Sequence, residues 1–335
     1  MTEYIEETKN VIQSDINASD LRWSLFVAAS KSYRYDSAVR PFPSEFIRKT
    51  DNEKDIKALR LTIEDVIPFQ LFLKDDFCLK DMSAASVKLL HWVLLSDSVI
   101  LQSMPKQEFE TIQKITGQSS LTPSPSHIFK VNCKLGAQQF QQNCIGKKTF
   151  FAFHGSSLQN FHSILNNGLI AHLNKNGLYG KGTYLSSELS VSLIYSPMGN
   201  SWRHSIFGSQ LSCVALCEII DHPDVKCKGK GTYGNCQQSS PDSLAGDIPD
   251  KYYLVQNNDL VRIRYLLVYS NSSRSENRIR VPKWWWKYRF TILMLSYVVI
   301  LIGISLSSSR ALQQFLWKAD CLVFIKVISS WDQFA

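Results

Sequence analysis

Hydrophobic positions in the first third of the chain recur with the spacing of amphipathic α-helices. Three segments show this pattern: 21–29, 56–63 and 84–104. The last segment is apolar over most of its length, but Ser96-Asp97-Ser98 makes it too polar for a good membrane span, so we expect a buried helix. The pattern therefore predicts an all-α regulatory or interaction domain over residues 1–118.

The Ser- and Pro-rich stretch Ser119–Ser126 marks a boundary, because the pattern changes after it. Apolar residues then occur in short runs typical of β-strands, at His127–Asn132, Thr149–Phe153, Gly182–Ser186, Leu211–Ile220, Tyr252–Val255 and Val261–Tyr269. Helices are expected between them at about Leu158–Asn167 and Glu188–Tyr195. Strands with few helices favour an α+β domain over a doubly wound parallel sheet, and we place this domain at residues 119–272.

A third pattern begins at Phe290, because no residue from there to Ser309 is charged. As a helix this segment would be about 30 Å long, which is the thickness of a bilayer's hydrocarbon core. Three tryptophans at 284–286 precede it, where interfacial aromatic anchors are common. A buried helix of a soluble domain is the alternative. We expect a single transmembrane tail anchor at 290–309, followed by a short lumenal tail at 310–335.

Charge indicates which side of that membrane the rest of the chain occupies. The formal net charge is +8. Part of the excess lies in a juxtamembrane linker at 273–289, with Arg274, Arg278, Arg280, Lys283, Lys287 and Arg289. A basic cluster beside an apolar span is typical of the cytosolic side, so the domains at 1–272 are expected in the cytosol. No nucleic-acid recognition motif accompanies the cations, and no specific nucleic acid is expected.

Cysteine usage agrees with a reducing compartment. The N-terminus is acidic and lacks an apolar run, so we expect no signal peptide, and the eight cysteines should be free thiols. Cys213 and Cys217 share one face of an expected strand. Zinc there is a less favoured alternative, because no CxxC pair is present, and we expect no metal.

Candidate chemistry gathers between Phe150 and Pro197. His154-Gly155 ends an expected strand and offers a ring hydrogen bond beside a closely approachable backbone. Glycines then space a loop that re-enters a strand at Tyr184, without the order of a Walker A or Rossmann motif. Ser192 precedes Tyr195 by one helical turn, on the same face. Taken singly, each of these residues has an ordinary structural interpretation.

Their combination is more specific. Four short motifs follow one another along the chain: HGS, N-F-x-x-I-L-x-x-G-L, Y-G-K-G-T-Y and S-x-x-Y. Their order and spacing are those of the poly(ADP-ribose) polymerase family. Residues 119–270 therefore resemble the catalytic domain of that family. The resemblance implies a split antiparallel β-sheet and NAD as co-substrate. It also implies a donor site made by His154, Gly155, Ser156, Tyr184, Ser192 and Tyr195.

The resemblance gives most of these residues a role. His154 corresponds to the histidine that hydrogen-bonds the adenosine ribose of NAD. Gly155 corresponds to the glycine whose backbone holds the nicotinamide carboxamide, and Ser192 to the serine that assists it. Tyr184 stands at the motif tyrosine, and Tyr195 at the tyrosine that stacks on the other face of the nicotinamide.

The third catalytic position departs from the chain-extending members of the family, which have Glu there. Counting back from Arg264-Tyr265-Leu266-Leu267 gives Tyr252, with Tyr253 as the alternative one residue away. A tyrosine, with an ordinary pKa of about 10, does not serve as a carboxylate base near neutral pH. His154, Tyr184 and Tyr252 are therefore the expected catalytic residues, and transfer of a single ADP-ribose is implied.

The resemblance extends to the layout of the chain. A helical N-terminal region and a C-terminal anchor are similar to those of the family's membrane-anchored branch, which implies the endoplasmic reticulum membrane. The expected partners are this bilayer and protein acceptors, including the protein itself. Two alternatives stay open: a tethered NAD-binding module without transferase activity, and a scaffold based on the helical region.

Overall fold

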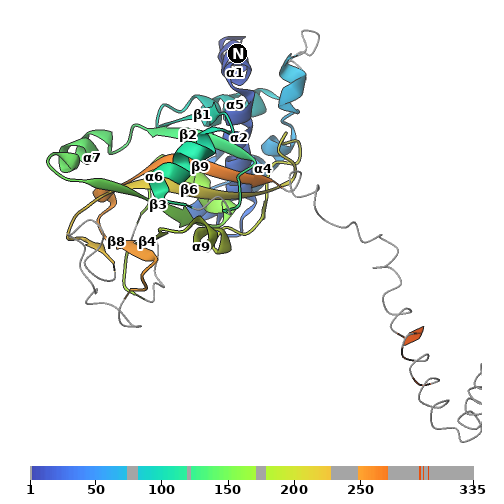
Figure 1. Ribbon diagram of the computed structural model, residues 1–335. Helices are drawn as coiled ribbons and strands as arrows, with labels where there is room; N and C mark the ends of the chain where they lie inside the picture. The colour runs from blue at the N-terminus through green and yellow to red at the C-terminus, as the bar shows by residue number, and fades with distance from the viewer. Residues whose placement is uncertain are drawn as a thin grey trace, which may run out of the picture. The chain divides into compact units, whose positions relative to one another are not determined.

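The computed structural model describes residues 2–73, 82–118, 122–170, 179–227 and 248–270, together with 294, 295, 297 and 301. The chain divides into two compact units, Met1–Glu276 and Asn277–Ala335 (Figure 1). The first unit contains the helical region, the sheet and all the predicted site residues.

The N-terminal region is helical, as the apolar spacing predicts. Its helices are α1 (Thr2–Ser14), α2 (Ile16–Lys31), α3 (Tyr35–Ala38), α4 (Ile56–Glu64) and α5 (Ala84–Leu95). Most residues of α2 are buried, because the other helices pack on one side of it and the sheet on the other. Asp15 starts α2 as a helix cap, since its carboxylate accepts a hydrogen bond from the backbone N–H of Ala18 at 2.9 Å.

Within the described residues, nine strands form one antiparallel sheet. Its order is β1-β2-β9-β6-β3-β4-β8-β7, and β5 also pairs with β6. The strands are β1 (Val99–Met104), β2 (His127–Cys133), β3 (Thr149–Gly155), β4 (Thr183–Ser186), β5 (Gly199–Asn200), β6 (Gln210–Ile220), β7 (Val225–Lys226), β8 (Tyr252–Val255) and β9 (Val261–Ser270). Four helices accompany them: α6 (Glu108–Thr116), α7 (Ala137–Cys144), α8 (Phe161–Asn167) and α9 (Leu189–Ile194).

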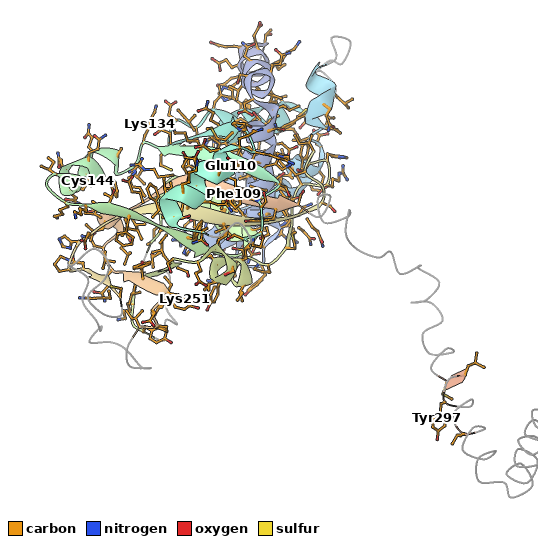
Figure 2. The ribbon with its side chains drawn as sticks, in the orientation of Figure 1. Phe109, Glu110, Lys134, Cys144, Lys251 and Tyr297 are labelled. Atoms are coloured by element: carbon orange, nitrogen blue, oxygen red, sulfur yellow. The ribbon has the colours of Figure 1, made fainter. Side chains whose placement is uncertain are left out.

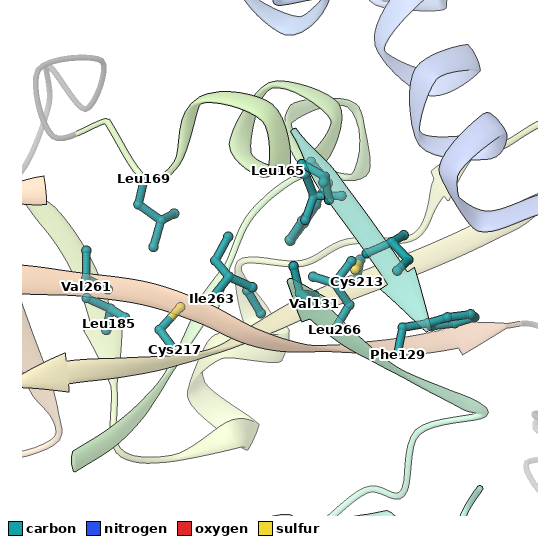
Figure 3. Packing of buried hydrophobic residues seen from close by; sticks show 14 of the residues in the cluster. Phe129, Val131, Leu165, Leu169, Leu185, Cys213, Cys217, Val261, Ile263 and Leu266 are labelled. Carbon is teal, nitrogen blue, oxygen red and sulfur yellow. The ribbon is translucent and has the colours of Figure 1, made fainter. Parts of the chain in front are cut away.

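Helices cover both faces of the sheet, so its central strands are buried on both sides (Figure 1). On one face α2 and α8 pack over the central strands, and Figure 3 shows Leu165 and Leu169 on the same side as Cys217 and Ile263. On the other face α6 and α9 contribute a smaller cluster around Phe153. Figure 2 shows the side chains of the first unit, with Phe109 labelled on α6.

The strands expected from the sequence are confirmed, and one expected helix is too long. All six predicted strands are present within one or two residues at each end. The helix expected over Ala84–Met104 is wrong beyond Leu95, because Ser96 leaves the helical conformation and Val99–Met104 forms strand β1, beginning with alternating buried and exposed residues. The expectation of an all-α region over 1–118 therefore fails at β1, which pairs with β2. Strands β5 and β7 and helix α7 were not predicted.

The predicted C-terminal segments lie almost wholly outside the described residues. Of the anchor at 290–309, only Met294, Leu295, Tyr297 and Leu301 are described, and they are helical. The linker at 273–289 and the tail at 310–335 are outside the described part. A search confined to the described residues finds no helix with the length and hydropathy of a membrane span.

Candidate active site

Neighbouring strands bring the predicted site residues together. His154 and Gly155 end β3, Tyr184 lies on β4, and Tyr252 begins β8, while the order β3-β4-β8 makes these strands neighbours. Strands β3 and β4 share a single paired position, Phe153 with Ser186, so the sheet separates just beyond it. The helix α9, which carries Ser192, packs against both strands at this point.

His154 is buried, and its ring is fixed by β4. Its Nδ1 lies 2.9 Å from the backbone carbonyl oxygen of Tyr184. Because a carbonyl only accepts, Nδ1 carries the proton and donates it. Burial lowers the pKa of His154, so the ring is neutral near pH 7. The other ring nitrogen, Nε2, is then a hydrogen-bond acceptor suited to a ligand hydroxyl.

Gly155 is needed for a close backbone approach. A Cβ at this position would lie 1.9 Å from the backbone oxygen of Ser192, which is too close for any side chain. The same serine donates from Oγ to the carbonyl oxygen of Phe153 at 3.1 Å, so it also ties α9 to β3. The N–H of Ser156 donates to Oγ of Ser196 at 3.1 Å. The end of β3, Ser192 of α9 and Ser196 just after α9 thus approach one another closely, and we call this arrangement the backbone cradle.

Tyr184 closes the glycine-rich loop on itself. Its hydroxyl donates to the carbonyl oxygen of Gly180 at 2.7 Å and accepts from the N–H of Tyr179 at 3.0 Å. Burial raises the pKa of the Tyr184 hydroxyl, which therefore stays protonated at neutral pH. The hydroxyl is engaged with the backbone, which leaves the ring as the part of this residue available to a ligand.

Tyr195 and Tyr252 approach each other from α9 and β8, with hydroxyl oxygens 3.5 Å apart. Tyr195 is 56 % exposed, so its ring can stack on a ligand. The hydrogen bond between the two hydroxyls, together with burial, raises the pKa of Tyr252 to about 12. Tyr253 points to the other face of the sheet, where its ring centroid lies 4.9 Å from that of Phe150. The geometry therefore favours Tyr252 over Tyr253 at the third position.

Two further residues support α9, and sequence reasoning missed both. Gln118 follows α6, and its side chain donates to the carbonyl oxygen of Ser187 at 2.7 Å and accepts from the N–H of Leu189 at 3.2 Å. Oγ of Ser196 accepts a hydrogen bond from the N–H of Ser156. No local signal identifies either contact, because Gln118 and Leu189 are 71 residues apart in the chain.

The cysteine pair that suggested zinc lies in the core of the sheet. Cys213 and Cys217 are fully buried on β6, and burial raises the pKa of both thiols. Across the described residues, no group of three or more His, Cys, Asp or Glu side chains is placed to hold a metal ion.

A neutral buried histidine, a close backbone approach and an exposed tyrosine ring have the properties that the polar riboses and flat nicotinamide of NAD require, which makes this a candidate donor site of an ADP-ribosyltransferase. Comparison with known sequences supports this class. The poly(ADP-ribose) polymerase catalytic domain matches residues 106–271, and the ARTD15 N-terminal domain matches residues 10–94.

Three relatives show how far the similarity extends. The human protein mono-ADP-ribosyltransferase PARP16 is 40% identical over 309 residues, covering 90% of this chain and 94% of the relative. The mouse protein of the same name is 39% identical over 307 residues, with the same coverage. Mouse protein mono-ADP-ribosyltransferase PARP8 is 26% identical over 226 residues, covering 58% of this chain and 23% of the relative.

The chain belongs to the poly(ADP-ribose) polymerase family, which confirms the resemblance found in the sequence. It is therefore an enzyme of a family that uses NAD as co-substrate. The residues present fit this co-substrate, because there is no room for a side chain at Gly155, and because the bond from Nδ1 of His154 to Tyr184 leaves Nε2 as a hydrogen-bond acceptor.

Proposed function

We propose that the protein transfers one ADP-ribose unit from NAD to side chains of acceptor proteins, itself included, and releases nicotinamide. The observation that carries this proposal is the 3.5 Å contact between the hydroxyls of Tyr252 and Tyr195. The family resemblance implies that Tyr252 stands where chain-extending members have Glu. The printed names of two relatives that cover 90% of this chain, both mono-ADP-ribosyltransferases, support it.

The side chains orient the donor and leave the acceptor to supply the nucleophile. When NAD is bound, its nicotinamide–ribose bond is the glycosidic bond that breaks, with positive charge developing at the ribose. Nε2 of His154 would accept a hydrogen bond from a ribose hydroxyl, and the backbone at Gly155 would hold the carboxamide. The ring of Tyr195 stacks on the nicotinamide and fixes the angle at which the acceptor side chain arrives.

The restriction to one unit follows from the chemistry of tyrosine. Extending a chain requires activation of a ribose hydroxyl, which a carboxylate can polarise as a hydrogen-bond acceptor. With its pKa raised to about 12, Tyr252 stays protonated at neutral pH and offers a hydroxyl in place of a carboxylate. It can orient the nicotinamide ribose through a hydrogen bond, but it does not prepare a second acceptor hydroxyl.

The direct test is incubation of the full chain with labelled NAD, followed by mass spectrometry of the labelled proteins. We expect single ADP-ribose units on protein side chains and stoichiometric release of nicotinamide. His154→Ala should abolish the label. Long polymer from the unaltered protein would contradict the single-unit proposal. Nicotinamide binding with no label on any protein would favour the tethered binding module.

We further propose that residues 290–309 anchor the protein in the endoplasmic reticulum membrane, with the catalytic part in the cytosol. The uncharged run, the tryptophans before it and the basic linker at 273–289 support this proposal. Deleting 290–335 should release a folded, active protein into the soluble fraction. Replacing the six cations of the linker should leave insertion intact but disturb its orientation. Membrane association that survives the deletion would place the anchor elsewhere.

A further inference from the structure

A buried carboxylate joins the helical region to the loop between β5 and β6. Asp20 of α2 is fully buried, and its Oδ1 accepts from Oγ of Ser205 at 2.5 Å and from Oγ of Ser24 at 3.1 Å. Its Oδ2 accepts from the backbone N–H of Ile206 at 2.9 Å. Two of the three donors therefore belong to a loop that lies about 185 residues further along the chain.

The loop itself is inserted into both hydrophobic cores. Trp202 belongs to the helical cluster, with its ring centroid 4.8 Å from Phe69 and 6.4 Å from Trp23. Phe207 belongs to the sheet cluster, with its ring centroid 6.0 Å from Phe129. A displacement of this loop would disturb both cores, so the loop is a fixed connection between them.

The same segment leads back to the donor site through a series of contacts. Gly199 packs so tightly on Leu158 that an added Cβ would lie 2.8 Å from the Cβ of Leu158. Oγ of Ser196 accepts a hydrogen bond from the N–H of Ser156. The carbonyl oxygen of Ser196 accepts a second one from Oγ of Ser212 at 2.6 Å. Tyr195 directly precedes Ser196. The contacts of Gly199 and Ser196 thus hold the segment on both sides of residues 197–198, and Ser196 is next to the tyrosine expected to stack.

We propose that Asp20 is a positioning residue for the nicotinamide side of the donor site, because it holds the segment 195–209 that carries Tyr195. This inference rests on the proposed transferase function. It assigns the helical region a task in catalysis without direct contact with the donor, since Asp20 acts through the loop and Ser196.

The energetics separate this task from ordinary stabilisation. Burying a carboxylate is costly unless donors satisfy it, and Asp20 has three. Burial nevertheless outweighs these hydrogen bonds and raises the pKa of Asp20 to about 6. The two oxygens of Asp20 fix the loop at two points, Ser205 and Ile206, and this geometry is what the donor site requires of the residue.

Asp15 provides a matched control on the same helix. Its carboxylate also bridges α2 to the sheet, accepting from the N–H of Ser103 at 2.7 Å and from Oγ of Ser103 at 2.6 Å. Ser103 lies on β1, which is at the opposite end of the sheet path from the strands β4 and β8 that carry the site. Asp15→Ala therefore weakens the contact between helical region and sheet without touching the segment 195–209.

The experiment measures KM and kcat for NAD, and nicotinamide affinity by calorimetry, in the full chain and its variants. We expect Asp20→Ala to raise KM and weaken nicotinamide binding, each by roughly tenfold. Asp15→Ala should leave both near the unaltered values at temperatures where all variants are folded. Asp20→Asn should restore both, because its amide can accept from Ile206 and donate to Ser205. Ser205→Ala should shift both in the same direction by roughly threefold, which tests the loop if Asp20→Ala does not fold.

Equal effects of Asp15→Ala and Asp20→Ala would overturn the proposal, as would unchanged KM and nicotinamide affinity in Asp20→Ala. Failure of the proposed function gives a different result. If the unaltered chain labels no protein, the transferase proposal fails, and the nicotinamide affinities of the same variants still decide the role of Asp20.

Discussion

The hydroxyl oxygens of Tyr195 and Tyr252 lie 3.5 Å apart, although the two residues are separated by 57 positions. Tyr195 directly follows helix α9, and Tyr252 begins strand β8. Only one of the two protons can lie between the oxygens, so the pair keeps a second proton for a ligand. Because Tyr195 is the ring expected to stack on nicotinamide, its contact with Tyr252 links donor stacking to the residue that replaces the family's carboxylate.

The first prediction concerns the hydroxyl of Tyr252. Tyr252→Phe keeps the ring on β8 but removes the hydrogen bond to Tyr195 and the one expected to the donor ribose. We expect kcat/KM for NAD to fall roughly tenfold, as for the loss of one hydrogen bond in the transition state. Thermal stability should be unchanged, because the Tyr195–Tyr252 contact is exposed.

Tyr253→Phe is the control for this prediction. Its ring packs on Phe150 on the other face of the strand, and the variant keeps this ring, so transfer should be unchanged. If the Tyr253 variant loses transfer and the Tyr252 variant keeps it, the third position has been assigned to the wrong tyrosine.

The second prediction concerns the cradle at Gly155. In Gly155→Ala the new methyl group would meet the backbone oxygen of Ser192 at 1.9 Å, so α9 must move away from β3. We expect a loss of about 1–3 kcal/mol in the free energy of unfolding and no measurable nicotinamide binding. Gly117→Ala is the control, because that glycine has a positive φ of 67° but open space around it. The Gly117→Ala protein should be destabilised by backbone strain alone and should bind nicotinamide normally.

The third prediction separates the ring of Tyr184 from its hydroxyl. Tyr184→Phe removes the hydrogen bonds with Tyr179 and Gly180 and should cost about 1–2 kcal/mol in the free energy of unfolding. KM for NAD should rise, because the loop beside the donor is less firmly held. Tyr184→Ala also removes the ring and should abolish transfer. Phe and Ala variants with equal activity would show that the ring has no part in donor binding.

Much of the sheet was predictable because its strands are short, apolar and bounded by polar turns. Besides the two-residue strands β5 and β7, the exception is β1, which is separated by three residues from the buried helix α5. The two elements merge into one mostly apolar run from Ala84 to Met104. Periodicity does not separate a buried helix from a buried strand in such a run. Only the pairing of β1 with β2 reveals the change.

The site was predictable where the motif is local and not where it depends on distant contacts. His154, Gly155 and Tyr184 follow from short patterns, whereas the choice of Tyr252 over Tyr253 required the register of β8 against β4. The bond between Asp20 and Ser205 spans 185 positions, and neither residue stands in a motif. Polar residues within an apolar helix pattern indicate burial at most, without naming a partner.

The last prediction uses the ionisation of Asp20. Its pKa is about 6 in the folded chain against an ordinary value of 3.8, because burial outweighs its hydrogen bonds. Between these values the folded state binds a proton that the unfolded state has lost, so lowering the pH from 7 to 4 stabilises the fold through this group. We expect this gain to be about 2 kcal/mol at pH 4, and to be absent in Asp20→Asn, which does not titrate. Urea unfolding gives the free energy of unfolding of the unaltered protein and of Asp20→Asn at pH 7 and at pH 4. The gain is the change, between the two pH values, in the difference between these free energies. A difference that is constant with pH, or that favours the Asn variant more at pH 4, would show that Asp20 is not a buried carboxylate in the folded protein.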